Sequence, residues 1–357
     1  MNRREFLGTT VGVTSVGLAG CIGGFGGLET KPLAFPPVLD DRPDGVYYPT
    51  HVEGMAGIGT GDAGPFRVAL SYSYPHRFWT VSGRTVSRQP IRDADDVHLM
   101  ATVWDPETGH VIPETSVTAE ITRDGDLVTQ EVLYPMLSQT MGVHYGDNFD
   151  LEEGDGEYAI TLEIGSLSIH RAGAFAGQFD DPATATIAFE YTEAKKREIG
   201  FRTTADQAGK AAAVEPMTMG GPPLGQAPER EAIPGRVLGS KTSDDAVLTM
   251  TVLDDGERFG AGPDDAYLAV SARTPYNGLI IPAMGLAATL RRDGGEIASG
   301  RLDRTLDPHL GYHYGMVVPP AVAGDGLEIR GDLPAQVARH EGYETAFLEL
   351  GAVEFDV

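Results

Sequence analysis

The sequence contains a single cysteine, Cys21, among its 357 residues. A disulfide within the chain and a thiolate metal site in the folded part are therefore excluded. Long apolar runs are also missing, because the weakly apolar stretch at residues 8–20 is too short to span a bilayer. There is no Gly-x-Ser-x-Gly elbow, nucleotide-binding loop or His-Glu-x-x-His pattern. We expect no enzyme, and a blue-copper centre would need a cysteine ligand.

Basic residues are few. The chain has 27 Lys and Arg against 52 Asp and Glu, which gives a formal net charge of -25. A negative field of this strength opposes binding to nucleic acid and to anionic membrane surfaces. It leaves an acidic surface suited to high salt, and we expect a halophilic source.

The N-terminus has the pattern of an export signal. Residues 2–7 form a twin-arginine pattern, Asn-Arg-Arg-Glu-Phe-Leu, and residues 18–21 form a lipoprotein cleavage pattern, Leu-Ala-Gly-Cys. We predict a twin-arginine lipoprotein signal at 1–21, lipidation of Cys21 and a flexible tether at 22–44. The protein would then be an exported cell-surface or extracytoplasmic lipoprotein that meets the membrane through its lipid anchor only. The alternative is a cleaved signal with an incidental cysteine.

Helical periodicity is nearly absent, and short alternating segments separated by Gly, Pro and Asp turns take its place. Examples are residues 66–74, 97–103, 116–122, 158–164 and 184–190. Alternation at this spacing is typical of an antiparallel β-sandwich. We therefore predict an all-β fold of immunoglobulin-like antiparallel β-sandwiches.

The second half of the sequence repeats the first. Asp-Asp-Val-His-Leu at residues 95–99 corresponds to Asp-Asp-Ala-Tyr-Leu at 264–268, 169 residues later (264 minus 95). His-Tyr-Gly at 144–146 corresponds to His-Tyr-Gly at 313–315 at the same offset. A register held over this length indicates a tandem duplication.

The duplication defines the expected domains. We predict a metal-binding sandwich at 45–192, a linker rich in Ala, Gly and Pro at 193–239, and a degenerate second sandwich at 240–357. The two sandwiches could pack as a pseudo-dimer, in the way that two subunits pack in a dimer. The alternative is that the second sandwich is an independent spacer.

Histidine and methionine gather in the first repeat. His98 and Met100 are two residues apart on a predicted strand, so their side chains lie on one face. Met136 and His144 are eight residues apart in a glycine-containing segment, and His170 follows a predicted strand. Three imidazoles and one or two thioethers without cysteine suit copper, and Met favours Cu(I). The alternative is a packed Met beside a hydrogen-bonded His.

These segments resemble the periplasmic iron-transport proteins. The matching parts are Asp-Val-His-Leu at 96–99, Tyr-Pro-Met at 134–136, His-Tyr-Gly-Asp-Asn at 144–148, Gly-Asp-Gly-Glu-Tyr at 154–158 and His170. That family has an immunoglobulin-like sandwich, binds copper and is implicated in iron uptake beside an iron permease. The resemblance covers about residues 60–191, and the His-Tyr-Gly-Asp-Asn turn is its specific part.

The resemblance implies a ligand set. His98, Met136, His144 and His170 match the family's metal ligands, while Met100 stands where the family has Glu. Because a soft sulfur replaces a hard oxygen there, copper is favoured over iron. The resemblance therefore implies copper, as Cu(I) or Cu(II), with iron as the other metal and a membrane iron permease as the partner.

The second repeat keeps few of these ligands. Tyr267, Ala269 and Thr305 replace the first His and the two Met, and only His313 and His340 remain. Two imidazoles alone make a poor site. We expect a degenerate second site at His313 and His340 that has lost its metal.

Two further groups are weaker candidates. His51, Glu53 and Met55 alternate, and they form either a second cation site or an exposed segment before the first strand. His76 is expected to pack in a loop, and Met217 to lie in the linker.

These features favour an exported, lipid-anchored protein that captures copper or iron and hands it to a membrane transporter. Histidines and thioethers release a metal more readily than a closed thiolate site, which suits delivery. The alternative is a structural or adhesive cell-surface protein whose His and Met are merely packed.

Overall fold

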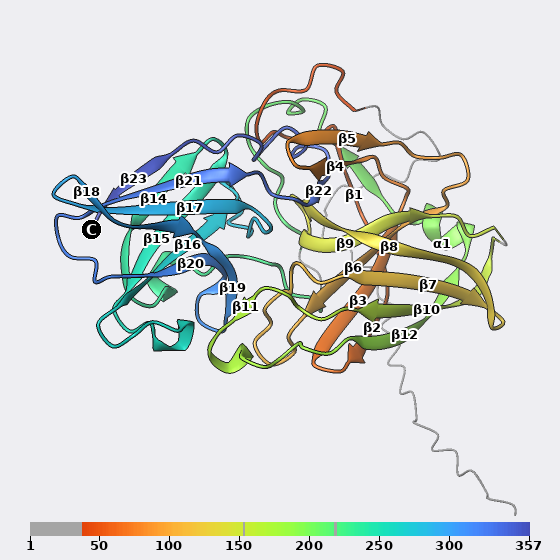
Figure 1. The fold of residues 1–357 in the computed structure, drawn as a ribbon. Coiled ribbons are helices and arrows are strands. Elements are labelled where there is room, and N and C mark those ends of the chain that lie inside the picture. Colours follow the sequence, from red (N-terminus) through yellow and green to blue (C-terminus); the bar gives the residue numbers. More distant parts are fainter. Residues whose placement is uncertain (1–37, 153, 218–219) are drawn as a thin grey trace, which may run out of the picture.

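The fold is known from a computed structural model that describes residues 38–152, 154–217 and 220–357. The predicted signal, with Cys21, and most of the tether lie outside the described residues. The regular secondary structure of the described residues is nearly all β-strand, which confirms the prediction of an all-β, sandwich-type fold. Figure 1 shows the two halves side by side, the first in orange to green and the second in teal to blue. No helix among the described residues has the length and apolar character needed to cross a membrane.

The first half is one path of strands that folds back on itself, in the order β12-β10-β7-β8-β9-β6-β3-β2. β8 (Asp126–Ser138) changes partner along its length, because its first part pairs with β7 and its last part with β9. The other strands are β2 (Ala56–Ala63), β3 (Phe66–Ser73), β6 (Val97–Trp104), β7 (Val117–Arg123), β9 (Gly142–Phe149), β10 (Gly156–Ile164) and β12 (Ala183–Tyr191).

The central strand β6 is buried on both faces. One face presents Val97, Leu99, Ala101 and Val103 to the main hydrophobic core. Because side chains alternate along a strand, the other face carries His98 and Met100. A polar group on a buried face requires a partner, and this second face of β6 is where the candidate site lies.

The second half has two sheets, with the strand orders β11-β19-β20-β16-β15-β14 and β18-β17-β21-β23. Its strands are β14 (Arg236–Ser243), β15 (Ala246–Leu253), β16 (Ala266–Arg273), β17 (Gly285–Arg292), β18 (Gly295–Arg301), β19 (Asp303–Asp307), β20 (Gly311–Val318), β21 (Gly326–Leu333) and β23 (Val353–Asp356). Two short 3-10 helices, η1 (Gly173–Phe175) and η3 (Glu257–Phe259), lie in loops.

The repeat seen in the sequence is also a repeat of local structure. β6 and β16 begin 169 residues apart (266 minus 97), as do β9 and β20 (311 minus 142). In the first half the Tyr145 hydroxyl donates to the carbonyl of Ile112 at 2.9 Å, and the equivalent Tyr314 donates to Ile281 at 2.7 Å. The same strand therefore carries the same buried hydrogen bond in each half.

The two halves exchange short strands. β11 (His170–Arg171) leaves the first half and pairs in parallel with β19. β22 (Ala338–Arg339) leaves the second half and pairs with β8 and with β4 (Phe78–Ser82), which also pairs with β5 (Thr85–Gln89). Figure 1 shows β22, in blue, among the orange and yellow strands. The residue after β22, His340, is thereby placed inside the first half.

The segment predicted as a linker packs on both halves, since its later part is bonded to the second half, where the Ala227 N–H donates to the carbonyl of Gly278 at 2.9 Å. It contains α1 (Glu193–Arg197), the 3-10 helix η2 (Arg230–Ala232) and β13 (Phe201–Thr203), which pairs with β1 (His51–Glu53). Further along, Met217 is buried, and its backbone N–H donates to the carbonyl of Thr140 at 2.8 Å. Its composition predicts a flexible connection, but main-chain hydrogen bonds, which composition does not reveal, hold this segment in place.

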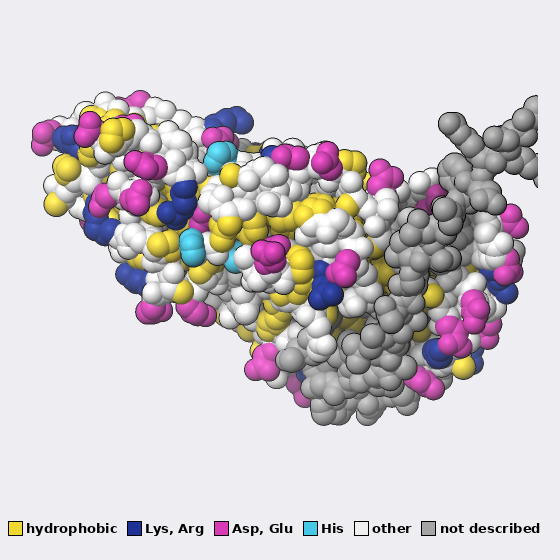
Figure 2. All heavy atoms as spheres, turned by 90° about the horizontal axis from the view of Figure 1, so that it is seen from below, with side chains coloured by type: hydrophobic (Ala, Val, Ile, Leu, Met, Phe, Trp, Pro, Cys, Tyr) yellow, Lys and Arg dark blue, Asp and Glu magenta, His cyan; other side chains and the backbone are white. Residues whose placement is uncertain are grey.

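The surface is acidic, in keeping with the charge of the sequence. Figure 2 shows Asp and Glu side chains scattered over one face, not gathered into a single patch. Several basic side chains on the surface pair with acidic neighbours, as Arg67 does with Asp62. Exposed pairs of this kind contribute little to stability.

Candidate metal centre

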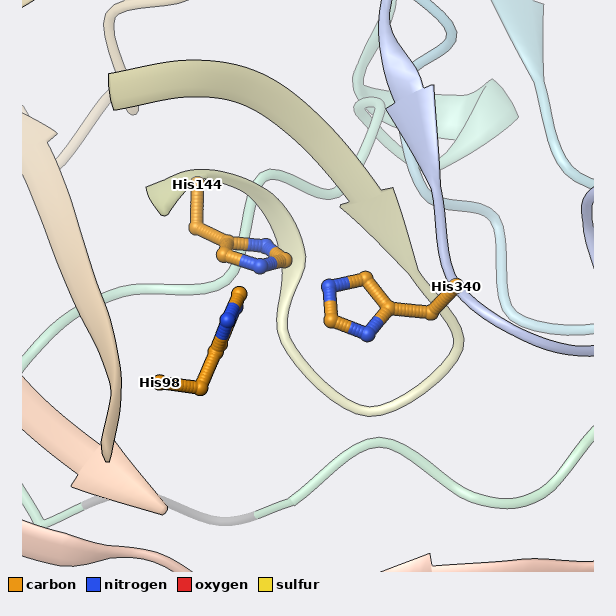
Figure 3. Close-up of side chains that lie close together, drawn as sticks. All are labelled: His98, His144 and His340. Carbon is orange, nitrogen blue, oxygen red and sulfur yellow. The ribbon is translucent and has the colours of Figure 1, made fainter. Parts of the chain in front are cut away.

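Three histidine rings meet at the second face of β6. His98 lies on β6, His144 on β9, and His340 directly after β22. One ring nitrogen of each lies within 4.8 Å of those of the other two. Figure 3 shows the three rings facing one another. Nitrogens about 2.0 Å from one metal ion lie at most about 4 Å apart, so one ion can contact all three rings after no more than a small inward movement.

The tautomer of His98 is fixed by Asn148. The Asn148 Nδ2 donates to the carbonyl of His76 at 2.8 Å, so its Oδ1 is the atom that faces the His98 Nδ1 at 2.8 Å. The backbone N–H of His76 donates to the same oxygen at 3.0 Å. Because an amide oxygen only accepts, His98 Nδ1 carries the proton. Its Nε2 is left with a free lone pair.

His144 is held in the same way. Its Nδ1 donates to the carbonyl of Gly142 at 3.0 Å, which leaves Nε2 without a proton. The Nε2 atoms of His98, His144 and His340 are all buried and have no hydrogen-bond partner. A buried polar atom without a partner costs about 1–3 kcal/mol. Three such atoms at one point are explained by a cation that accepts their lone pairs.

Burial keeps these rings neutral. It lowers the pKa of His144 to about 4. Burial, followed by the charge of His76, places the pKa of His98 well below its usual range. The pKa of His340 is also well below its usual range, owing to burial and then to His144, His76 and His98. Neutral imidazole is the form that binds a metal, so the site needs no deprotonation at neutral pH.

A thioether reaches the same space. Met136 is fully buried on β8, opposite His144 across the β8–β9 pair and beside Ala338 of β22. A Cβ added to Gly146 would lie 2.9 Å from His98 Nε2 and 3.3 Å from the sulfur of Met136. The imidazole and the sulfur therefore approach each other over this glycine, which provides the room they need.

The structure brings together three of the predicted ligands and replaces a fourth. His98, Met136 and His144 lie together as the sequence suggested. The placement of His170 with them is wrong, because β11 carries it to β19, where it pairs with Thr305. His340, predicted for the second site, takes its place. Met100 is buried on the same strand face as His98 and packs with other methionines.

The pair predicted for the second site does not form either, since β22 carries His340 away from His313. Burial lowers the pKa of His313 to about 4, and its Nδ1 donates to Gly311 at 3.0 Å. Its Nε2 lies 3.1 Å from the hydroxyl of Tyr267, the residue that replaces His98. The Tyr267 side chain lies over Gly315, as His98 lies over Gly146. The Tyr267 hydroxyl therefore takes up the Nε2 lone pair of His313, which is the only one this ring could give to a metal.

Substituting Tyr267 by Phe tests this pairing. We expect Tyr267→Phe to lower the free energy of unfolding by about 1–3 kcal/mol, because it leaves His313 Nε2 buried without a partner. Denaturant unfolding measures the change. The matched control is Tyr276→Phe, since Tyr276 is 54% exposed and should change little. Equal stability of the two variants would contradict the pairing.

A second polar group lies beside the three rings. Glu53 pairs with His76 at 3.0 Å and with His51 at 2.9 Å. Although burial raises the pKa of Glu53, His76 and His51 outweigh it and hold it well below its usual range. The rings of His76 and His98 are 4.6 Å apart. The segment around His51 and Glu53, one interpretation of which is an exposed stretch, is thus partly buried. His76, expected to pack in a loop, lies next to the three histidines.

Arg339 fixes the strand that delivers His340. Its side chain is fully buried, with Nη2 donating to the carbonyl of Ala335 at 2.9 Å and Nη1 to that of Ala346. The guanidinium also lies 5.6 Å from the ring centre of Phe347. Residues 335–347 therefore surround the Arg339 side chain, and these contacts hold β22 against β8.

Comparison with known proteins gives one family and partial likenesses. The model of a family described as a domain of unknown function (DUF7350) matches residues 79–170 and 231–356, more than half of the chain and all three histidines. The "34 kDa membrane antigen" of Treponema pallidum (strain Nichols) is 30% identical over 130 residues, 32% of this chain and 62% of that protein. The chain thus spans less than two thirds of that relative's length.

Two solved structures of FetP from uropathogenic Escherichia coli strain F11 also match. A copper-bound variant has a TM-score of 0.31 and 22% identity over 38% of this chain and 97% of its own. The as-isolated protein has a TM-score of 0.28 and 19% identity over 39% and 96%. At these scores the two likenesses do not bear on the site.

Proposed function

The chain belongs to the DUF7350 family, whose description names no activity, and we propose that it is an exported, lipid-anchored protein that binds copper at His98, His144 and His340. The observation that carries the proposal is the convergence of three buried ring nitrogens without hydrogen-bond partners. Core packing does not explain this arrangement, because each buried nitrogen without a partner lowers the stability of the fold.

The donor set selects the metal. Three neutral imidazoles suit several transition metals, while the sulfur of Met136 adds a soft donor. No carboxylate of the described residues belongs to the group of three rings. Hard cations that prefer oxygen ligands are therefore disfavoured, and copper in either oxidation state fits best.

We propose binding and delivery in place of catalysis. Nitrogen and thioether donors release an ion more readily than thiolates do, which suits transfer to another protein. The resemblance of residues 96–99 and 144–148 to the periplasmic iron-transport proteins supports a role in iron uptake with a membrane permease. The patterns at residues 2–7 and 18–21 support twin-arginine export and a lipid anchor.

Copper titration of the purified protein tests the proposal. We expect one equivalent of Cu(II), bound in competition with a chelator. Asn148→Ala should lower the affinity by about 10–100-fold, because it frees the His98 ring and its tautomer. His309→Ala, which removes an exposed histidine, is the control. Absence of saturable copper binding, or equal binding by Asn148→Ala and His309→Ala, would refute the site.

A further inference from the structure

Four methionines form a cluster beside the histidines. Met55 follows β1, Met100 lies on β6, Met141 lies between β8 and β9, and Met217 lies in the segment after β13. They are 9%, 3%, 3% and 6% exposed, and they pack into an apolar cluster that contains no other buried residue type. Four separate parts of the chain thus bring a thioether to one place.

Ordinary core packing does not account for this composition. The main core of the described residues is built mostly from Val, Leu, Ile, Ala and aromatic side chains, with few methionines. The chain has ten methionines in all. Met fills irregular gaps in cores, but four of the ten methionines in one cluster without a branched residue is a composition that the main core does not share. What the four side chains share is a polarizable sulfur that donates to soft cations.

The cluster lines a cavity of about 90 Å³ that also reaches His144 and His340. Hydrogen bonds hold the backbone at two of its members, since the Met217 N–H donates to the carbonyl of Thr140 at 2.8 Å and the Met141 N–H donates to Ser138 Oγ at 3.0 Å. Partly exposed residues, including His51 and Glu341, line the same cavity. The four methionine side chains are therefore buried, two of them have a backbone held by hydrogen bonds, and all four border a space that an ion can enter.

We propose that Met55, Met100, Met141 and Met217 form a second cation site, specific for a soft monovalent ion such as Cu(I). Neutral thioethers favour Cu(I) and Ag(I), whereas divalent ions such as Cu(II) and Fe(II) prefer nitrogen or oxygen donors. This site goes beyond the proposed function, because it uses none of the three histidines and does not depend on which metal they bind.

Silver titration of a variant without the histidines isolates the second site. In His98→Ala/His144→Ala/His340→Ala we expect one equivalent of Ag(I), a redox-stable probe for Cu(I), and no equivalent of Cu(II). With methyl-labelled methionine, Ag(I) should shift the NMR resonances of the four cluster methyl groups. The methyl group of Met250, a buried core methionine outside the cluster, should not shift.

Adding Met100→Leu/Met141→Leu to this variant should lower Ag(I) affinity by more than 10-fold, because Leu keeps the volume but removes the sulfur. Met250→Leu is the matched control. If the double substitution does not fold, Met217→Leu, which lies outside the sandwich strands, gives the same test. The site is refuted if the histidine-free variant binds no Ag(I), or if the cluster substitutions leave binding intact. If the wild-type protein binds Ag(I) but shows no saturable Cu(II) binding, only the proposed function is refuted.

Discussion

We expect His340→Ala to lower copper affinity as strongly as His98→Ala, although the two residues come from different halves of the chain. Loss of an outer partner of a metal ligand typically costs about 10–100-fold. Loss of one of three direct imidazole ligands should exceed that. The expected result follows from β22, which places His340 within 4.8 Å of the other two rings. Chelator competition of wild type and variants measures it.

His170→Ala is the control for this experiment. His170 holds the equivalent position in the first repeat, but it is exposed and its strand pairs with β19. We expect its substitution to leave copper affinity unchanged. The reverse pattern, in which His170→Ala loses copper and His340→Ala keeps it, would show that each half folds its late histidine onto itself. That outcome would contradict the strand exchange.

We expect the metal-free protein to lose stability steeply as the pH falls from about 7 to 4. The pKa of His144 and that of His313 are each lowered by burial from 6.5 to about 4. Between pH 6.5 and pH 4 these histidines bind protons in the unfolded chain but stay neutral in the folded chain. Their contribution to the free energy of unfolding is therefore complete above pH 6.5 and is lost as the pH falls towards 4. Each histidine corresponds to about 3 kcal/mol over that range. The pKa of His98 and that of His340 are lowered in the same direction.

One neighbour acts in the opposite sense. Burial lowers the pKa of His76, but Glu53 outweighs it and raises that pKa above the usual value. The pairing of His76 therefore stabilises the fold at low pH and weakens as the pH rises. It offsets only part of the loss, because at least four buried histidines oppose it.

Denaturant unfolding at pH 7 and at pH 4.5 measures the net effect. Copper should raise the midpoint at pH 7 and have much less effect at pH 4.5, because protons compete for the same nitrogens. His313→Gln removes a titrating group outside the metal centre and should flatten part of the pH dependence. A midpoint equal at both pH values would contradict the burial of neutral rings.

Much of the fold follows from local patterns. Period-two alternation predicts the strands, and the constant offset between repeats relates β6 to β16 and β9 to β20. One ligand follows from the same pattern, because side-chain direction along a strand places His98 on the face opposite the core. His144 and Met136 follow only from the resemblance of their motifs, and the His-Tyr-Gly-Asp-Asn segment, expected as a turn, is part of strand β9.

Local patterns do not predict that His170 and His340 are each placed in the opposite half of the chain. Whether β22 pairs with its own half or with the other depends on how the two sandwiches pack, and local periodicity carries no information about that. One signal is available. The second repeat keeps His340 and His313 although it has lost the equivalents of His98, Met100 and Met136. A histidine kept where most of its local partners are lost indicates that other partners lie elsewhere.

The methionine cluster was hidden for a related reason. Alternation along a strand predicts the face that carries Met100, but Met55, Met141 and Met217 lie in three further segments, one of them expected to be a linker. The Gly, Pro and Ala content of that segment predicts only a connection. Its buried side chains are set by tertiary contacts that a sequence window does not contain.

The strand exchange has a mechanical consequence. Because the ligands come from both sandwiches, an ion held by them cross-links the two halves. By mass action, copper at 100 times its dissociation constant would add about 2.7 kcal/mol to the docked arrangement. Copper supply would then govern how often the halves separate, and an empty protein would expose its connecting segment to proteases more often than a loaded one.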